Sequence, residues 1–319
     1  MVLDTEITTG IDMKKISIVG AGRVGETTAQ MLAIRELAHQ VSLLDLCEGA
    51  AEGAALDIQE SAAMHGFDTR LTGSTNPEIL EGSSIVIITA GMPRKPGMSR
   101  SDVLDANLSI TTSIVNDIKK IAPDAMMIIV SNPVDIMTHQ AWKLSGCDRS
   151  KIIGLSGALD AARMATFVAM ETGFSARDIS TMVLGGHGDT MVPLPRYTCV
   201  RGIPIDHFLD SETIARIVDR TRNGGAEILS LKKNSSAYGA PAAAITGMVD
   251  AIVHDRKSII PCVTILNGEY GQKDIAMGVP AVLGEGGLER VIELPLNSEE
   301  TSAFEKSAKA VQADLERIA

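Results

Sequence analysis

One histidine in the chain stands in a setting that favours chemistry. His187 lies in the run Gly185-Gly186-His187-Gly188-Asp189, which follows a short apolar segment over 181–184. Glycines on both sides give this turn backbone conformations that other residues avoid, so it is an unusual place for a histidine of the core. An imidazole also titrates near neutral pH. His187 is therefore the candidate chemical residue, and we interpret the other histidines as surface or packing residues.

Two charged side chains share one face of an expected helix. Residues 157–173 have helical spacing, and Asp160 and Arg163 occupy neighbouring positions on one face because they lie three residues apart. The alternative is a surface ion pair. The sequence alone does not show whether Asp160 reaches His187.

Three cations, Arg94, Lys95 and Arg100, lie in a loop over 92–100 that also contains two prolines and a glycine. The loop follows a β-branched run over 84–89, which is typical of a parallel strand buried on both faces. Ligands bind beyond the carboxyl ends of such strands in doubly wound sheets. A solvated basic loop is the alternative, but this position and the acidic background of the chain favour a binding loop.

A polar side chain follows the next expected buried strand, over 126–130. Asn132, in the run Ser131-Asn132-Pro133, offers a hydrogen-bond donor and an acceptor at the same sheet edge. The alternative is a plain turn residue before proline. The Asn132-Pro133 bond could be cis or trans.

Residues 14–45 indicate the fold that must position these side chains. They predict a strand over 15–19, a glycine turn, a helix, and a second strand over 41–44 that ends at Asp45. In this dinucleotide-binding pattern the glycines allow a tight turn and close approach to a pyrophosphate, which the positive end of the helix dipole faces. The turn comprises Gly20, Ala21, Gly22, Arg23, Val24 and Gly25.

Asp45 indicates which dinucleotide fits. It lies 20 residues beyond Gly25, where an acidic side chain can accept hydrogen bonds from a ribose diol and repel a 2′-phosphate. We therefore predict NAD rather than NADP. The alternative is a glycine-rich turn between a strand and a helix that binds no nucleotide.

Length and charge limit the classes of protein that fit. A chain of 319 residues suggests two domains, which we place at 13–150 and 151–319, after a disordered leader over 1–12 or a natural start at Met13. The net charge of −11 argues against nucleic-acid or membrane partners, and no apolar run is long enough to span a bilayer. The four cysteines form no CxxC pair, so we predict no metal site. We expect the thiols to be free and buried, as in a protein of the reducing cytoplasm.

The remaining elements complete the expected fold. Strands are expected over 69–73 and 262–266, and helices over 48–65, 102–122, 212–231, 242–253 and 297–319. Gly66 should end the first of these helices, and Asn297 with Glu300 should cap the start of the last. The sequence thus predicts an α/β fold, a doubly wound parallel sheet of Rossmann type with a C-terminal α+β substrate domain.

Taken together, the motifs resemble the lactate/malate dehydrogenase family, in the lactate-dehydrogenase-like branch of its malate enzymes. The resemblance extends from about residue 13 to the C-terminus. Its carriers are GAGRVG with Asp45, ITAGMPRKPGMSR from Ile88, VSNPVD from Val130, LDAAR from Leu159 and GGHGD from Gly185. It implies an NAD-dependent oxidoreductase that interconverts (S)-malate and oxaloacetate, a step of the tricarboxylic acid cycle, in a dimer or tetramer.

The resemblance also implies a role for each site residue. His187 would accept the proton of the substrate hydroxyl, Asp160 would orient its ring, and Arg163 would grip the C1 carboxylate. Arg100 would polarise the carbonyl from a closing loop, and Asn132 would bond the substrate oxygen. The nicotinamide side would be completed by Thr89, Ala90, Gly91, Asn107, Val130, Ser131 and Asn132.

By the same resemblance, Arg94 discriminates between substrates. An arginine there pairs with a second carboxylate, as in oxaloacetate, whereas lactate enzymes usually carry an uncharged residue such as glutamine. An unpaired buried cation is unfavourable, so the site should reject pyruvate. The alternatives are an L-lactate or another 2-hydroxy-acid dehydrogenase and, in another class, a non-catalytic dinucleotide-sensing module on the same fold. A module that only binds the dinucleotide would not need this set of charged residues, which comprises Arg94, Arg100, Asp160, Arg163 and His187.

Overall fold

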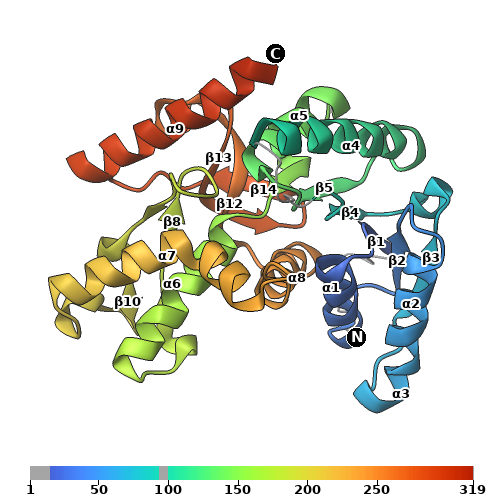
Figure 1. The fold of residues 1–319 in the computed structure, drawn as a ribbon, viewed down its shortest axis with the longest axis horizontal. Coiled ribbons are helices and arrows are strands. Elements are labelled where there is room, and N and C mark those ends of the chain that lie inside the picture. The colour runs from blue at the N-terminus through green and yellow to red at the C-terminus, as the bar shows by residue number, and fades with distance from the viewer. Residues whose placement is uncertain (1–14, 93–99, 319) are drawn as a thin grey trace, which may run out of the picture.

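Six parallel strands form the sheet of the first half of the chain. The computed structural model describes residues 15–92 and 100–318, with the backbone alone for 100–102. The order of these strands in the sheet is β3-β2-β1-β4-β5-β6 (Figure 1). The order reverses between β1 and β4, where doubly wound sheets bind ligands at the carboxyl edge. The predicted Rossmann sheet is confirmed. The bounds are Lys15–Val19 (β1), Gln40–Leu44 (β2), Arg70–Ser74 (β3), Ile85–Ile88 (β4), Met126–Ile129 (β5) and Ile152–Gly154 (β6).

The sheet continues beyond β6 with three antiparallel strands from the second half of the chain. β12 (Ser258–Asn267) pairs with β6, and β13 (Lys273–Gly284) and β14 (Gly287–Val291) follow it. The sequence predicted only a short strand over 262–266 here. It did not reveal β13, because most of that strand is buried on both faces and lacks the alternation that marks a half-buried strand.

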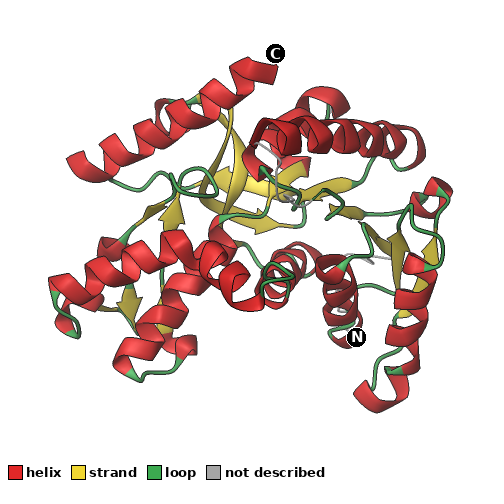
Figure 2. Cartoon of the chain, viewed as in Figure 1, coloured by secondary structure: helices red, strands yellow, loops and turns green. Residues whose placement is uncertain are grey.

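Helices cover both faces of this sheet (Figure 2). One face is covered by α4 (Arg100–Ile121), α5 (Val134–Ser145) and α9 (Ser298–Ile318). The other is covered by α1 (Arg23–Ile34), α2 (Ala50–Glu60) and α8 (Gly239–Val253). Strand β4 shows the division, since Ile85 and Ile87 belong to the apolar cluster of one face and Val86 and Ile88 to that of the other.

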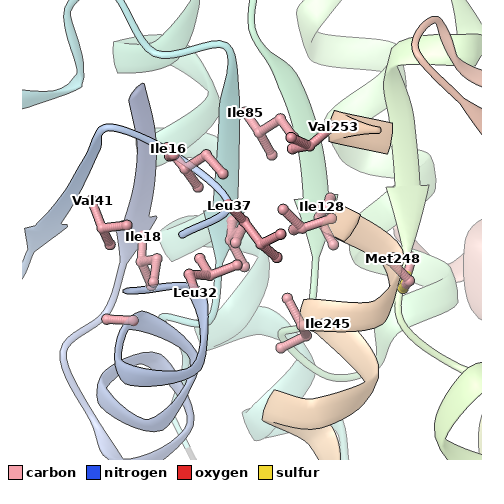
Figure 3. Close-up of a cluster of buried hydrophobic side chains, with 14 of the residues drawn as sticks. Ile16, Ile18, Leu32, Leu37, Val41, Ile85, Ile128, Ile245, Met248 and Val253 are labelled. Carbon is pink, nitrogen blue, oxygen red and sulfur yellow. The ribbon is translucent and has the colours of Figure 1, made fainter. Parts of the chain in front are cut away.

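The apolar cluster under α1 and α8 joins the two halves of the chain (Figure 3). Ile16, Ile18 and Ile128 of the parallel strands are fully buried there. They share the cluster with Leu32 of α1 and Ile245 of α8. Each buried side chain of this size contributes about 1.5–3 kcal/mol relative to its exposed state. Because α8 comes from the second half of the chain, this cluster packs one helix from each half against the same face of the sheet.

The second half has a smaller apolar cluster of its own. In it α6 (Gly157–Thr172) and α7 (Ser211–Lys232) pack together through Met164, Phe167 and Ile217. Short strands complete this α+β part: β7 (Ile179–Ser180), β10 (Cys199–Val200) and β11 (Ile203–Pro204) in one sheet, and β8 (Val183–Leu184) and β9 (Val192–Pro193) in another.

Several local predictions can be compared directly with the structure. The helix expected over 48–65 is divided into α2 and α3 (Ala62–His65), and Gly66 ends it with a φ of 73°. Asn297 and Glu300 form the predicted capping box, with bonds of 2.9 and 2.8 Å. The expectation of buried cysteines is confirmed only for Cys262, since Cys47 is exposed and Cys147 and Cys199 are half-buried; all four thiols are free. Within residues 15–92 and 100–318, no helix is long and apolar enough to cross a membrane.

Candidate active site

Close backbone contacts shape the glycine turn between β1 and α1. Gly20 has a φ of 105°, and a Cβ there would lie 2.7 Å from the backbone nitrogen of Ala90. A Cβ at Gly25 would lie 1.9 Å from the carbonyl oxygen of Gly20, so no larger residue fits there. α1 begins directly after Gly22, and no described side chain caps it. Its first N–H groups are therefore available to an anion such as a pyrophosphate.

Asp45 lies at the carboxyl end of β2, beside this turn. Its Oδ2 accepts the N–H of Ala21 at 2.8 Å, and its Oδ1 accepts the N–H of Cys47 at 2.9 Å. These bonds fix the carboxylate and leave further lone pairs for the hydroxyls of a ribose. The turn over 20–25 and Asp45 thus fit a dinucleotide of the NAD type.

Side-chain hydroxyls tie this turn to the ends of the neighbouring strands. Thr89 donates to the carbonyl oxygen of Gly20 at 2.9 Å. Ser131 donates to the carbonyl oxygen of Ala90 at 2.5 Å. The carboxyl ends of β1, β4 and β5 are thereby held together, at the edge where the sequence predicted cofactor contacts.

Asn107 of α4 positions two strand ends at this edge. It is buried, its Oδ1 accepts the N–H of Met92 at 2.7 Å, and its amide donates to the carbonyl oxygen of Asn132 at 2.7 Å. A contact between Asn107 and the cofactor stays a prediction. The side chain of Asn132 is exposed at the same edge, and its bond to Pro133 is cis.

His187, Asp160 and Arg163 meet in one cluster. His187 Nδ1 lies 2.7 Å from Asp160 Oδ2, and Arg163 Nη1 donates to Asp160 Oδ1 at 2.8 Å. Asp160 is only 1% exposed, which excludes the surface ion pair that the sequence left open. With its Nδ1 held by a carboxylate, the imidazole keeps Nε2 for proton exchange. The structure therefore brings together three residues that the sequence had only placed on separate elements.

The charges of the cluster favour a protonated imidazole. Burial alone lowers the pKa of His187, but the charge and hydrogen bond of Asp160 and the charge of Asp135 raise it above its ordinary value of 6.5. The charge of Arg163 opposes this rise. His187 can therefore carry a proton near neutral pH and return it to a substrate.

The turn that carries His187 is held by three consecutive backbone N–H groups, each of which donates to a different element. The acceptors lie on β13, α9 and α5. The hydrogen bonds run from Gly185 to the carbonyl oxygen of Gly278 (2.8 Å), from Gly186 to Ser307 Oγ (2.8 Å) and from His187 to Asp135 Oδ2 (2.9 Å). Since Asp135 follows Asn132 by three residues, the last bond places the histidine turn near the carboxyl end of β5.

The sequence analysis missed Asp135 and Ser307. Asp135 belongs to the motif VSNPVD, but an acidic residue in the first turn of a helix is ordinary and gave no separate signal. Ser307 lies on the buried face of α9, whose other buried residues are apolar. An aspartate and a histidine that are 52 positions apart cannot be paired from spacing alone.

Arg163 lies against two glycines in the middle of α7. A Cβ at Gly224 would lie 3.1 Å from Arg163 Cδ, and a Cβ at Gly225 would lie 3.7 Å from its Nη2. Glycine destabilises a helix interior by about 1 kcal/mol relative to alanine. The pair of glycines therefore indicates that room for the guanidinium group matters more here than helix propensity.

The two arginines predicted on the loop over 92–100 cannot be placed in this site. Arg94 lies outside the described residues, as does the side chain of Arg100, whose backbone begins α4. Within the described part of the chain, no three His, Cys, Asp or Glu side chains are grouped to hold a metal ion. The described residues can bind a carboxylate at Arg163 and exchange a proton at His187.

Two family models together match nearly the whole chain. The model of the lactate/malate dehydrogenase NAD binding domain matches residues 14–154, and that of the alpha/beta C-terminal domain matches residues 157–319. Since the glycine turn and Asp45 lie within the first match, NAD is the cofactor of this chain.

Curated relatives and solved structures span nearly the whole chain. A malate dehydrogenase of Nitrosococcus oceani is 60% identical over 96% of this chain and 99% of its own length, and that of Thioalkalivibrio sulfidiphilus is 59% identical over 96% and 100%. The apo malate dehydrogenase of Picrophilus torridus has a TM-score of 0.92 at 43% identity, covering 95% and 96% of the two chains. A lactate dehydrogenase of Cryptosporidium parvum, complexed with lactic acid and its nicotinamide cofactor, also has a TM-score of 0.92, at 37% identity over 96% and 98%. With both halves matched by its models, the chain belongs to the lactate/malate dehydrogenase family.

Proposed function

We propose that the chain interconverts (S)-malate and oxaloacetate, with NAD as its hydride carrier. The observation that carries this proposal is the buried carboxylate of Asp160, which binds His187 through one oxygen and Arg163 through the other. A 2-hydroxy acid presents a hydroxyl proton and a carboxylate, and this cluster offers one group for each. The relatives named malate dehydrogenase, at 59–60% identity, support a dicarboxylate substrate.

Different residues would bind the substrate and transfer its proton. Arg163 would bind the C1 carboxylate, because its guanidinium has donors beyond the one that it gives to Asp160. His187 would take the hydroxyl proton at Nε2, while Asp160 stabilises the imidazolium that forms. By the family resemblance, Arg100 and Asn132 would contact the substrate oxygen. NAD, when bound, accepts the hydride that leaves C2.

The direct test compares substrates. NADH oxidation by the purified protein should be much faster with oxaloacetate than with pyruvate at matched concentrations. A preference for pyruvate would keep the proton chemistry but make the chain a lactate dehydrogenase. Tight NADH binding without turnover of either acid would instead favour the non-catalytic sensor.

The two reaction directions should respond oppositely to pH. Reduction of oxaloacetate requires protonated His187, so its kcat/KM should fall as the pH rises through the raised pKa of this residue. Oxidation of malate requires the neutral imidazole and should rise over the same range. Steady-state profiles from pH 5 to 10 in both directions measure this. An inflection of both profiles below pH 6.5, the ordinary value, would contradict the assigned role of Asp160.

Gly224→Ala should weaken substrate binding without weakening the fold. The new Cβ would displace Arg163 Cδ by a few tenths of an ångström, so we expect KM for oxaloacetate to rise about tenfold, or ~1.4 kcal/mol. Alanine should meanwhile favour the helix by about 1 kcal/mol. Substrate titration and thermal unfolding measure the two effects. Gly247→Ala in α8, with no atom within 4 Å of its Cβ, is the control and should leave KM unchanged.

The family resemblance also supports a proposal about the wider setting of the enzyme. We propose a homo-oligomer, a dimer or a tetramer, that acts in the cytoplasm in the tricarboxylic acid cycle and binds neither nucleic acid nor membranes. Residues 13–150 would form the NAD-binding domain and 151–319 the substrate domain. Residues 1–12, the predicted leader, lie outside the described residues. Sedimentation of the purified protein would distinguish the oligomers.

A further inference from the structure

His187 has a second buried carboxylate behind it. Asp135, in the first turn of α5, is 5% exposed, and its Oδ2 accepts the backbone N–H of His187 at 2.9 Å. Its other oxygen, Oδ1, is buried and has no hydrogen-bond partner among the described residues. Burial of a carboxylate with one unpartnered oxygen destabilises the fold, because the charge loses its hydration. Its presence here therefore indicates a functional role.

The charged groups around His187 indicate the functional role of Asp135. The described charged groups that act on the imidazole are Asp160 and Arg163 from α6 and Asp135 from α5. Burial lowers the pKa of His187, the charge and hydrogen bond of Asp160 raise it most, and the charge of Arg163 lowers it. Asp135 adds a second negative charge that favours the protonated imidazole formed when His187 takes the substrate proton.

We propose that Asp135 is a positioning residue for the proton transfer, which fixes the backbone of His187 through one carboxylate oxygen and stabilises its imidazolium form through its negative charge. The inference rests on the proposed function, since His187 must be the proton carrier. Burial raises the pKa of Asp135 itself to about 6, so the group is a carboxylate at neutral pH and above, where its charge is needed.

Ser307 provides the matched control. Its hydroxyl holds the adjacent N–H of Gly186 at 2.8 Å, so it clamps the same turn but carries no charge. Loss of either contact loosens the turn. Only loss of the Asp135 charge should also change the proton affinity of His187.

The experiment compares the pH dependence of oxaloacetate reduction in the native enzyme, Asp135→Asn and Ser307→Ala. Asparagine can still accept the His187 N–H, and circular dichroism checks that each variant folds. We expect the apparent pKa of kcat/KM to fall by about one unit in Asp135→Asn and to stay at the native value in Ser307→Ala. Native and Asp135→Asn profiles with the same inflection, or an equal fall in Ser307→Ala, would overturn the proposal.

A second measurement needs no variant. In the native protein, the Cγ signal of Asp135 should titrate near pH 6 in NMR spectra, because burial raises the pKa of this carboxyl group. A Cγ signal that titrates well above pH 7 would show that the group carries no charge at neutral pH and would overturn the proposal. Turnover of the native enzyme in the same assays tests the proposed function separately, so failure of one is distinguishable from failure of the other.

Discussion

His187→Asn should lower kcat for oxaloacetate reduction about a thousandfold. Asparagine can occupy the turn and bond to Asp160, but it cannot deliver a proton near neutral pH. The glycine turn over 20–25 and Asp45 are untouched, so NADH should bind within a few fold of its native affinity. Steady-state kinetics with oxaloacetate and NADH fluorescence titration measure the two quantities.

His254 is the matched control for this variant. Its Nδ1 also lies close to an aspartate, 3.1 Å from Asp250 Oδ1, but its side chain is 47% exposed at the end of α8. His254→Asn should therefore leave kcat unchanged. If His187→Asn kept more than a tenth of the native kcat, proton transfer would have to be assigned to another group.

Arg94→Gln should lower the preference for oxaloacetate over pyruvate by about a thousandfold in kcat/KM. The family resemblance assigns Arg94 to the second carboxylate of the substrate, and a charge pair worth several kcal/mol gives discrimination of this size at ~1.4 kcal/mol per tenfold. Glutamine removes the charge that oxaloacetate needs and that pyruvate leaves unpaired. Side-by-side kinetics with both acids provide the ratio.

Arg201→Gln is the control for a simple loss of charge. Arg201 pairs with Asp178 at 2.7 Å, and its side chain is 78% exposed, so the pair contributes little. Its replacement should leave the substrate ratio at the native value. An unchanged ratio in Arg94→Gln would remove the reason for preferring malate over lactate as the substrate.

The parts of the site that the sequence predicted well are those encoded locally. The glycine turn follows from the spacing of three glycines and one aspartate. For Gly20 and Gly25 the structure shows the reason, since an added Cβ would lie 2.7 and 1.9 Å from backbone atoms. The capping box at Asn297 is likewise a local signal, and it was predicted to the residue. Such features need no knowledge of how distant segments pack.

The parts that the sequence could not predict depend on contacts between distant segments. The distance between Asp160 and His187, the burial of Asp160 and the contact with Asp135 all arise from packing between α5, α6 and the turn over 185–187. Strand β13 was hidden for a related reason, because a strand covered on both faces carries no alternating pattern. The resemblance supplied the pairing of Asp160 with His187 but not the role of Asp135.

The continuous nine-stranded sheet has a consequence for how such chains can evolve. β6 ends at Gly154 and α6 begins at Gly157, so no linker separates the halves, and β12 covers the far edge of β6. A chain cut at this point would bare a buried strand edge, which invites pairing with other chains. The halves are therefore not exchangeable modules. New specificity is more readily gained by changing loops at the carboxyl edge than by recombining one half with a foreign partner.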